Sequence, residues 1–192
     1  MDERSIARNI KTLRMKKRMS LEELAKLTGL TRGYLSKVER SHRAPPLSTL
    51  NKIAVTLGVE LTFFLQEDTE EDTEEGKDGK LAIVRKNKGK KVITKGTLYG
   101  YEYEAVAYNK SGKNMEPFII APTTGKEGNF KHEGEEFMYV LEGTHEFKYN
   151  GKKYILKKGD SIYFDSGVPH SGRSLGGKKA KVLSIIYSYK RE

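Results

Sequence analysis

The sequence contains no cysteine, and this absence limits its chemistry. Without thiols the chain can form no disulfide, no cysteine-ligated zinc finger and no thiol nucleophile. It also has no apolar run approaching the roughly 18 residues that cross a bilayer, and its first residues, MDERSIARN, lack the core of a signal peptide. We therefore expect a soluble, cytoplasmic protein, whose 192 residues suit two small domains.

Charge is segregated along the chain. Residues 1–66 hold 13 Lys/Arg against 6 Asp/Glu, residues 67–79 hold 1 against 8, and residues 80–192 hold 22 against 12. The middle stretch, EDTEEDTEEGKDG, has no apolar residue and is predicted to be a flexible acidic linker between two domains, 1–66 and 80–192. The basic N-terminal domain has the charge of a phosphate binder, although a solvated lysine-rich surface is the alternative.

In the N-terminal domain, the sequence predicts a helix that ends at a glycine. Ser20 with Glu23 three residues later forms a capping box, which predicts a helix from Ser20 to about Thr28. Gly29 would end that helix. An antiparallel helix pair with a solvated basic face would show the same local pattern.

A second, basic helix is predicted after this glycine. Thr31 is a good N-cap, and Leu35 and Val38 lie three apart on one face. In a helix-turn-helix unit the second helix enters the major groove, with its N-terminal residues at the base edges. The side chains expected to contact DNA are therefore Thr31, Arg32, Tyr34, Ser36 and Lys37.

Residues 4–65 resemble the lambda-repressor-like helix-turn-helix domains of the XRE type. The matching segments are LEELAKLTGL, TRGYLSKVERS and PPLSTLNKIAVTLGV. The resemblance implies an all-α, five-helix domain completed by residues 59–65, an internal salt bridge between Arg14 and Glu39, and a contact of Arg43 with the DNA backbone. Leu21 departs from the family, which often has a DNA-contacting Gln at that position.

Beyond the linker the hydrophobic period becomes that of strands. Asn150-Gly151 is a strong signal for a two-residue hairpin. No helical pattern interrupts the region, so the expected fold is an all-β double-sheet jelly roll. Nine strands are predicted, at residues 81–85, 92–95, 98–108, 116–121, 136–141, 144–149, 153–157, 161–164 and 181–189.

Two segments of this half resemble the two motifs of the cupin superfamily, and the resemblance covers residues 80–190. HEGEEFMYVLEG contains His132 and Glu136, and the second motif runs from Gly159 to His170. Cupins often hold one metal ion in a jelly-roll barrel, and the resemblance implies His132, Glu136 and His170 as its ligands. The chain departs from the family with Phe130 for the first His, Asp165 for Pro and Ser174 for Asn.

Two imidazoles and one carboxylate form a sensible facial triad. Such a triad suits Fe(II) and, less selectively, Mn, Ni or Zn. His132 and Glu136 are an even number of residues apart, which places both on one strand face if the strand extends that far. The alternative is a degenerate cupin that keeps these residues as hydrogen-bonded polar groups without metal. His145, which alternates with Phe147, is interpreted as an ordinary sheet residue.

The order of the two domains resembles that of one-component transcription regulators. The function predicted on this basis is a homodimer that binds a double-stranded DNA operator with two half-sites, about 34 Å apart. A small-molecule effector in the cupin, with or without a metal, would change the spacing of the two recognition helices.

An enzyme is the alternative function. The same order of domains, with an iron triad that lacks the first His, resembles hydroxypropylphosphonic acid epoxidase, a mononuclear iron enzyme. Tyr101, Tyr103 and Asn129 match positions that resemble its substrate-binding residues, and with Phe130 they form the predicted ligand pocket. The groove-facing side chains of the second helix favour the regulator, because a helical scaffold alone would not need them.

Overall fold

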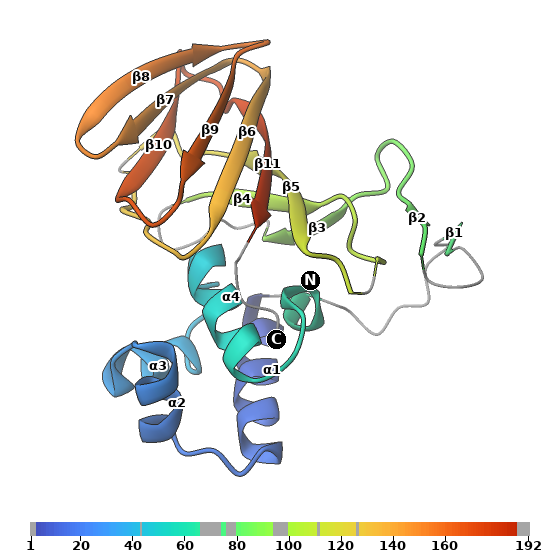
Figure 1. The fold of residues 1–192 in the computed structure, drawn as a ribbon, viewed down its shortest axis with the longest axis vertical. Helices are drawn as coiled ribbons and strands as arrows, with labels where there is room; N and C mark the ends of the chain where they lie inside the picture. Colours follow the sequence, from blue (N-terminus) through green and yellow to red (C-terminus); the bar gives the residue numbers. More distant parts are fainter. Residues whose placement is uncertain are drawn as a thin grey trace. The chain divides into compact units, whose positions relative to one another are not determined.

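The computed structural model describes residues 3–42, 44–65, 74–75, 80–93, 100–110, 112–125 and 127–187. The chain divides into two compact units, an N-terminal unit of helices and a C-terminal unit of strands (Figure 1). In the described part of the chain no helix is long and apolar enough to cross a membrane.

The N-terminal unit consists of four α-helices and one short 3-10 helix. Where a fifth helix was expected, at residues 59–65, the described chain has a 3-10 helix over residues 61–65, with tighter i to i+3 bonds than an α-helix, so four α-helices are present there instead of five. The bounds are α1 Glu3–Lys16, α2 Leu21–Thr28, α3 Arg32–Val38, α4 Leu47–Thr56 and η1 Leu61–Leu65.

The predicted caps of α2 are confirmed. The backbone N–H of Glu23 donates to Ser20 Oγ over 3.1 Å, and the backbone N–H of Ser20 donates to Glu23 Oε2 over 2.6 Å. Gly29 ends the helix with φ of 67°, in the left-handed region that glycine adopts without a steric penalty. These local bonds fix where the two helices of the motif meet.

The core of this unit is formed by apolar side chains at helical spacing. Because their spacing places them on one face of each helix, they meet in a single interior. The fully buried members are Ile6, Ile10, Leu24, Leu35, Leu50, Ile53, Leu57, Leu61 and Phe64.

Arg14 and Glu39 form the internal salt bridge that was predicted. Arg14 Nε and Nη2 donate to the two carboxylate oxygens of Glu39 over 2.6 and 2.8 Å. Arg14 Nη1 also donates to the backbone oxygen of Met19 over 2.7 Å. The bonds to Glu39 raise the pKa of Arg14 and connect α1 to the end of α3.

The C-terminal unit contains a six-stranded sheet, a three-stranded sheet and a two-stranded ladder. The order of the large sheet is β3-β4-β5-β11-β6-β9, the small sheet is β10-β7-β8, and the ladder is β1-β2, with all pairings antiparallel. The bounds are β1 Glu74–Glu75, β2 Ala82–Ile83, β3 Lys90–Ile93, β4 Glu102–Ala105, β5 Met115–Ala121, β6 Glu135–Glu142, β7 Thr144–Tyr149, β8 Lys152–Lys157, β9 Ser161–Asp165, β10 His170–Leu175 and β11 Lys181–Tyr187.

Two strands differ from the sequence-based expectation. β10 was not predicted, because its sequence HSGRSL contains a glycine and no β-branched residue. β1 lies inside the predicted linker, where Glu74 pairs with Ile83 and Glu75 with Ala82. Backbone pairing thus extends to two acidic residues whose composition indicated a flexible chain.

The hairpin at Asn150-Gly151 is confirmed. Asn150 and Gly151 have φ of 47° and 80°, the positive values that a type I′ turn requires at both central positions. The turn joins β7 to β8, with Tyr149 opposite Lys152.

The two larger sheets pack against each other through their inner faces. The ring of Phe147 on β7 lies 4.8 Å from the ring of Phe164 on β9, centroid to centroid. Phe118, Val140 and Val182 of the large sheet are also fully or almost fully buried. Apolar side chains therefore line much of the space between the sheets, and the polar side chains that enter it need a separate explanation.

Candidate functional site

Three polar side chains converge in this interior. Glu136 Oε2 lies 3.5 Å from His132 Nε2 and 3.9 Å from His170 Nε2. The donor atoms of all three lie within 4.8 Å of one another, and the two imidazole rings meet edge to face. His132, Glu136 and His170 are only 9%, 3% and 5% exposed. The structure thus brings together the three residues proposed as ligands.

Glu136 is oriented by a neighbouring strand. Ser184 on β11 donates a 2.6 Å hydrogen bond to Glu136 Oε1 in the buried interior. The other oxygen, Oε2, is the one that faces both histidines. The serine therefore leaves one lone-pair-bearing oxygen directed at the imidazoles.

His170 is oriented by its own loop. Its Nδ1 lies 2.9 Å from the backbone oxygen of Val168. Because a carbonyl can only accept, Nδ1 carries the proton, and Nε2 presents its lone pair toward Glu136. Burial lowers the pKa of His170, which favours the neutral ring that binds metals.

Backbone bonds fix the segment that carries the other histidine. Phe130 and His170 exchange two hydrogen bonds of 2.8 and 2.9 Å, and the N–H of His132 donates to Ser166 O over 2.9 Å. The ring of Phe130 lies edge to face on that of Tyr101, at 5.1 Å. The ring at the position of the missing first His is thus an apolar wall of the site.

The donor set fits a divalent cation. Ligands held about 2.0–2.2 Å from one ion lie roughly 3–4 Å from one another, as Glu136 Oε2 does from both imidazole nitrogens. Distances of 3.5 Å and more are too long for good hydrogen bonds within the cluster. Two neutral imidazoles and one carboxylate suit Fe(II), Mn, Ni or Zn, and the chemistry alone does not choose among them.

The predicted ligand-pocket residues are divided between the interior and the surface. Tyr101 and Tyr103 are buried, and burial raises the pKa of both phenols, so both are neutral donors. The hydroxyl of Tyr101 donates to the backbone oxygen of Gly172. Phe130 is half-buried, whereas the side chain of Asn129 is exposed.

His145 is a buried polar residue whose special position sequence reasoning missed. The side chain is 2% exposed. Within the described residues neither ring nitrogen has a partner in hydrogen-bonding geometry. The nearby backbone of Arg173 acts to raise the pKa of the ring. Burial lowers the pKa of His145 to about 4. Its ring occupies the place of a Gly172 side chain, since a Cβ there would lie 2.3 Å from His145 Cε1.

Five of the six predicted DNA-contacting residues lie along α3, from its N-cap to its last turn. Thr31 caps the helix by accepting a 3.1 Å hydrogen bond from the N–H of Tyr34. Arg32 and Lys37 are exposed, whereas Tyr34 and Ser36 are half-buried. Arg43 lies outside the described residues. The five described side chains are thus distributed from the N-cap to the last turn of one helix, and the two cations among them are accessible to solvent.

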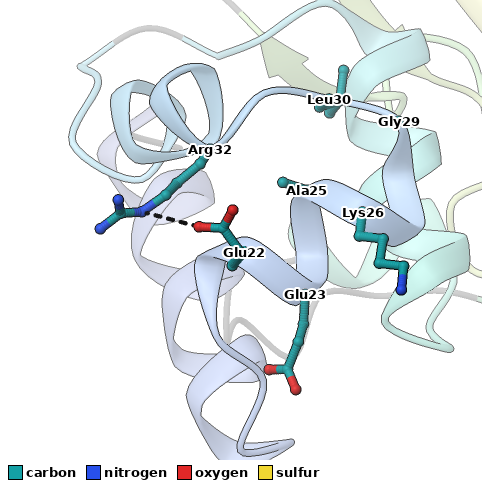
Figure 2. Close-up of a pocket in the computed structure, with 7 residues that line it drawn as sticks. All are labelled: Glu22, Glu23, Ala25, Lys26, Gly29, Leu30 and Arg32. Atoms are coloured by element: carbon teal, nitrogen blue, oxygen red, sulfur yellow. Dashed lines mark ion pairs between the residues drawn. The ribbon is translucent and has the colours of Figure 1, made fainter.

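Figure 2 shows a surface hollow between α2 and the start of α3. In it Glu22 points toward Arg32, and Glu22 Oε2 lies 3.7 Å from Arg32 Nε. Both side chains are largely exposed, at 79% and 71%. This ion pair was not anticipated, because only the fold sets the distance between the two helices.

Two family models match the chain. Residues 10–64 match the model described as helix-turn-helix, and residues 118–186 match the model described as cupin domain. The chain combines a helix-turn-helix domain with a cupin domain. α2 and α3 lie within the first match, and the three converging side chains lie within the second.

Relatives resemble either the whole chain or one part of it. The HTH-type transcriptional regulator PuuR of Escherichia coli (strain K12) is 25% identical over 177 residues, which cover 92% of this chain and 91% of PuuR. The (S)-2-hydroxypropylphosphonic acid epoxidase of Streptomyces wedmorensis is 27% identical over 96 residues, which cover 45% of this chain and 48% of the epoxidase.

A solved structure shares the fold of both domains. The crystal structure of an HTH_3 family transcriptional regulator from Vibrio cholerae has a TM-score of 0.66 and is 24% identical. The alignment covers 100% of this chain and 98% of that chain. The fold of this chain, a helical unit followed by a strand unit, thus occurs in a known structure.

Proposed function

We propose that the protein is a sequence-specific DNA-binding transcription regulator whose cupin domain binds a small-molecule effector. The observation that carries this proposal is the similarity to a transcriptional regulator, PuuR, along nearly the whole length of both chains. We also propose that it acts in the cytoplasm, where an operator would be accessible.

DNA reading is assigned to α3. It offers Arg32, its first residue, and Lys37, in its last turn, to solvent, and Tyr34 between them is half-buried. In a helix-turn-helix unit these positions face base edges and phosphates. With η1 counted as the fifth segment, the domain takes the five-helix arrangement of lambda-repressor-like domains, and Arg43 reaches the DNA backbone.

The regulator is proposed to act as a homodimer held through residues 80–192. A single helix-turn-helix unit makes few base contacts, whereas two units read half-sites about 34 Å apart. The cupin domain closes into a jelly-roll barrel whose interior receives the effector. The effector shifts the dimer between two states only by as much as its affinity differs between them.

His132, Glu136 and His170 are proposed to hold a divalent metal in that barrel. The support is the convergence of their donor atoms and the bonds from Ser184 and to Val168 that orient two of them. A bound cation would supply a Lewis-acidic anchor for an oxygen group of the effector. Tyr101 and Tyr103 would line the same pocket.

Selection of genomic fragments by the full-length protein, followed by footprinting, tests DNA binding. Arg32→Ala or Lys37→Ala should weaken operator binding by about 1–3 kcal/mol if the side chain reads a base edge. Lys52→Ala removes the same charge from an exposed position on α4 and is the control. Failure to enrich any sequence, with binding equally weak for all fragments, would contradict the proposal.

An iron enzyme remains the second candidate, because the epoxidase match is real although it covers less than half of the chain. Full-length protein loaded with Fe(II) would be incubated with (S)-2-hydroxypropylphosphonate and either oxygen or peroxide. We expect no turnover. Turnover that Glu136→Ala abolishes, in a protein without DNA binding, would reverse the ranking of the two functions.

A further inference from the structure

Glu22 and Arg32 place opposite charges at the edge of the proposed DNA-binding surface. Arg32 is the first residue of α3, and Glu22 is the second residue of α2. In helix-turn-helix complexes the first helix of the motif crosses the DNA backbone, while the second enters the groove. The Glu22 carboxylate thus lies where phosphates approach, next to a cation that would bind them.

The pair cannot be explained by stability. Its atoms are 3.7 Å apart, and both side chains are more than two-thirds exposed. Exposed pairs of this kind contribute little to folding. The neighbouring Glu23 differs, because its carboxylate accepts the Ser20 N–H in the capping box, and Figure 2 shows its side chain directed away from Arg32.

We propose that Glu22 restrains non-specific DNA binding by holding Arg32 in an intramolecular ion pair. Without Glu22, the guanidinium could neutralise any phosphate, which is a sequence-independent gain in affinity. With Glu22 in place, a phosphate that approaches Arg32 must displace the Glu22 carboxylate and is repelled by it, whereas a base edge in the groove carries no such negative charge. Glu22 is therefore a specificity-determining residue, and this inference rests on the proposed DNA-binding function.

The test uses a short labelled duplex of random sequence, so no operator needs to be known. Binding of the full-length protein is measured by fluorescence anisotropy over a series of potassium chloride concentrations. Glu22→Gln should tighten binding about threefold to tenfold at low salt, and it should steepen the slope of log K against log salt by about one. Glu23→Gln makes the same change of charge one residue away and should have a clearly smaller effect.

A double variant shows whether Glu22 acts through Arg32. In an Arg32→Ala background, Glu22→Gln should tighten binding no more than Glu23→Gln does. Equal effects of the two glutamine variants in the native background would overturn the inference while leaving DNA binding intact, and so would a Glu22→Gln effect that persists without Arg32. Absence of duplex binding by every variant at low salt would instead remove the proposed function, and the inference with it.

Discussion

Ser184 Oγ lies 2.6 Å from Glu136 Oε1, and this bond joins the only carboxylate of the His132–Glu136–His170 cluster to the next strand. The bond fixes the rotation of the carboxylate, so that Oε2 faces both imidazoles. Ser184 is therefore a positioning residue for the proposed metal site.

Ser184→Ala should weaken metal binding about tenfold to a hundredfold while all three ligands remain. Affinity for Zn²⁺ or Co²⁺ can be measured by competition with a chromophoric chelator. Ser171→Ala is the matched control, because Ser171 Oγ donates to Glu127 instead of to a ligand. Equal affinities for the wild type and Ser184→Ala would show that the hydrogen bond does not orient the carboxylate.

The Arg14–Glu39 pair should be important for the stability of the helical unit. Glu39→Gln leaves a largely buried guanidinium without its anion, which should cost about 3 kcal/mol of unfolding free energy in urea. Glu142→Gln breaks an exposed 2.8 Å pair with Lys181 and should cost far less, because solvent screens this pair. If the two variants lose the same stability, burial does not strengthen the Arg14 pair.

His145 should make the protein sensitive to acid. The pKa of His145 is about 4 in the folded chain, against 6.5 for an ordinary histidine, so the unfolded chain binds the proton first as the pH falls. The contribution of neutral His145 to the unfolding free energy is full above about pH 6.5. It is lost progressively as the pH falls to about 4. The loss amounts to about 3 kcal/mol.

In chemical denaturation experiments between these two pH values, His145→Leu should reduce the fall in unfolding free energy with decreasing pH. His42→Gln removes an exposed histidine and should leave this pH dependence unchanged. If the unfolding free energy of His145→Leu falls with pH as steeply as that of the wild type, other groups cause the acid sensitivity.

Gly172→Ala should destabilise the cupin domain by about 1–3 kcal/mol in thermal or urea unfolding. The new Cβ would lie 2.3 Å from Cε1 and 2.6 Å from Nε2 of the buried His145 ring. Adding His145→Ala should recover part of the loss, because the clash disappears. Gly33→Ala is the contrasting variant, since no atom lies within 4 Å of its Cβ and it should stabilise α3 by up to about 1 kcal/mol. If Gly172→Ala leaves the unfolding free energy unchanged, the ring of His145 moves aside without cost.

Local signals predicted the helical unit well. The capping bonds of Ser20 and Glu23 span three residues, and the left-handed Gly29 follows directly after α2, so both can be read from neighbouring positions. The Arg14–Glu39 bridge spans 25 residues, and it was predicted only through resemblance to a family. The structure adds the Glu22–Arg32 pair, which depends on the angle between two helices.

The strand unit was harder to predict in detail. β10 was missed because its residues are polar and small, and it is a strand because β7 pairs along its whole length. The Ser184–Glu136 bond spans 48 residues and depends on the register of β6 against β11. The same holds for His145 and Gly172, which register alone brings together. The three proposed ligands were predicted through the resemblance to cupins, whereas the residues that orient them were not predicted.

The two-residue turn at Asn150-Gly151 has a consequence for the order of folding. β7 and β8 can pair within microseconds, because their ends are already adjacent. β5 and β11 pair only after β6 to β10 have been accommodated between them in the chain, and such long-range closure is slow. Ser184 lies on β11, so the carboxylate of Glu136 acquires its hydrogen-bond partner among the last steps, and the proposed cation site is completed only when the sheet is.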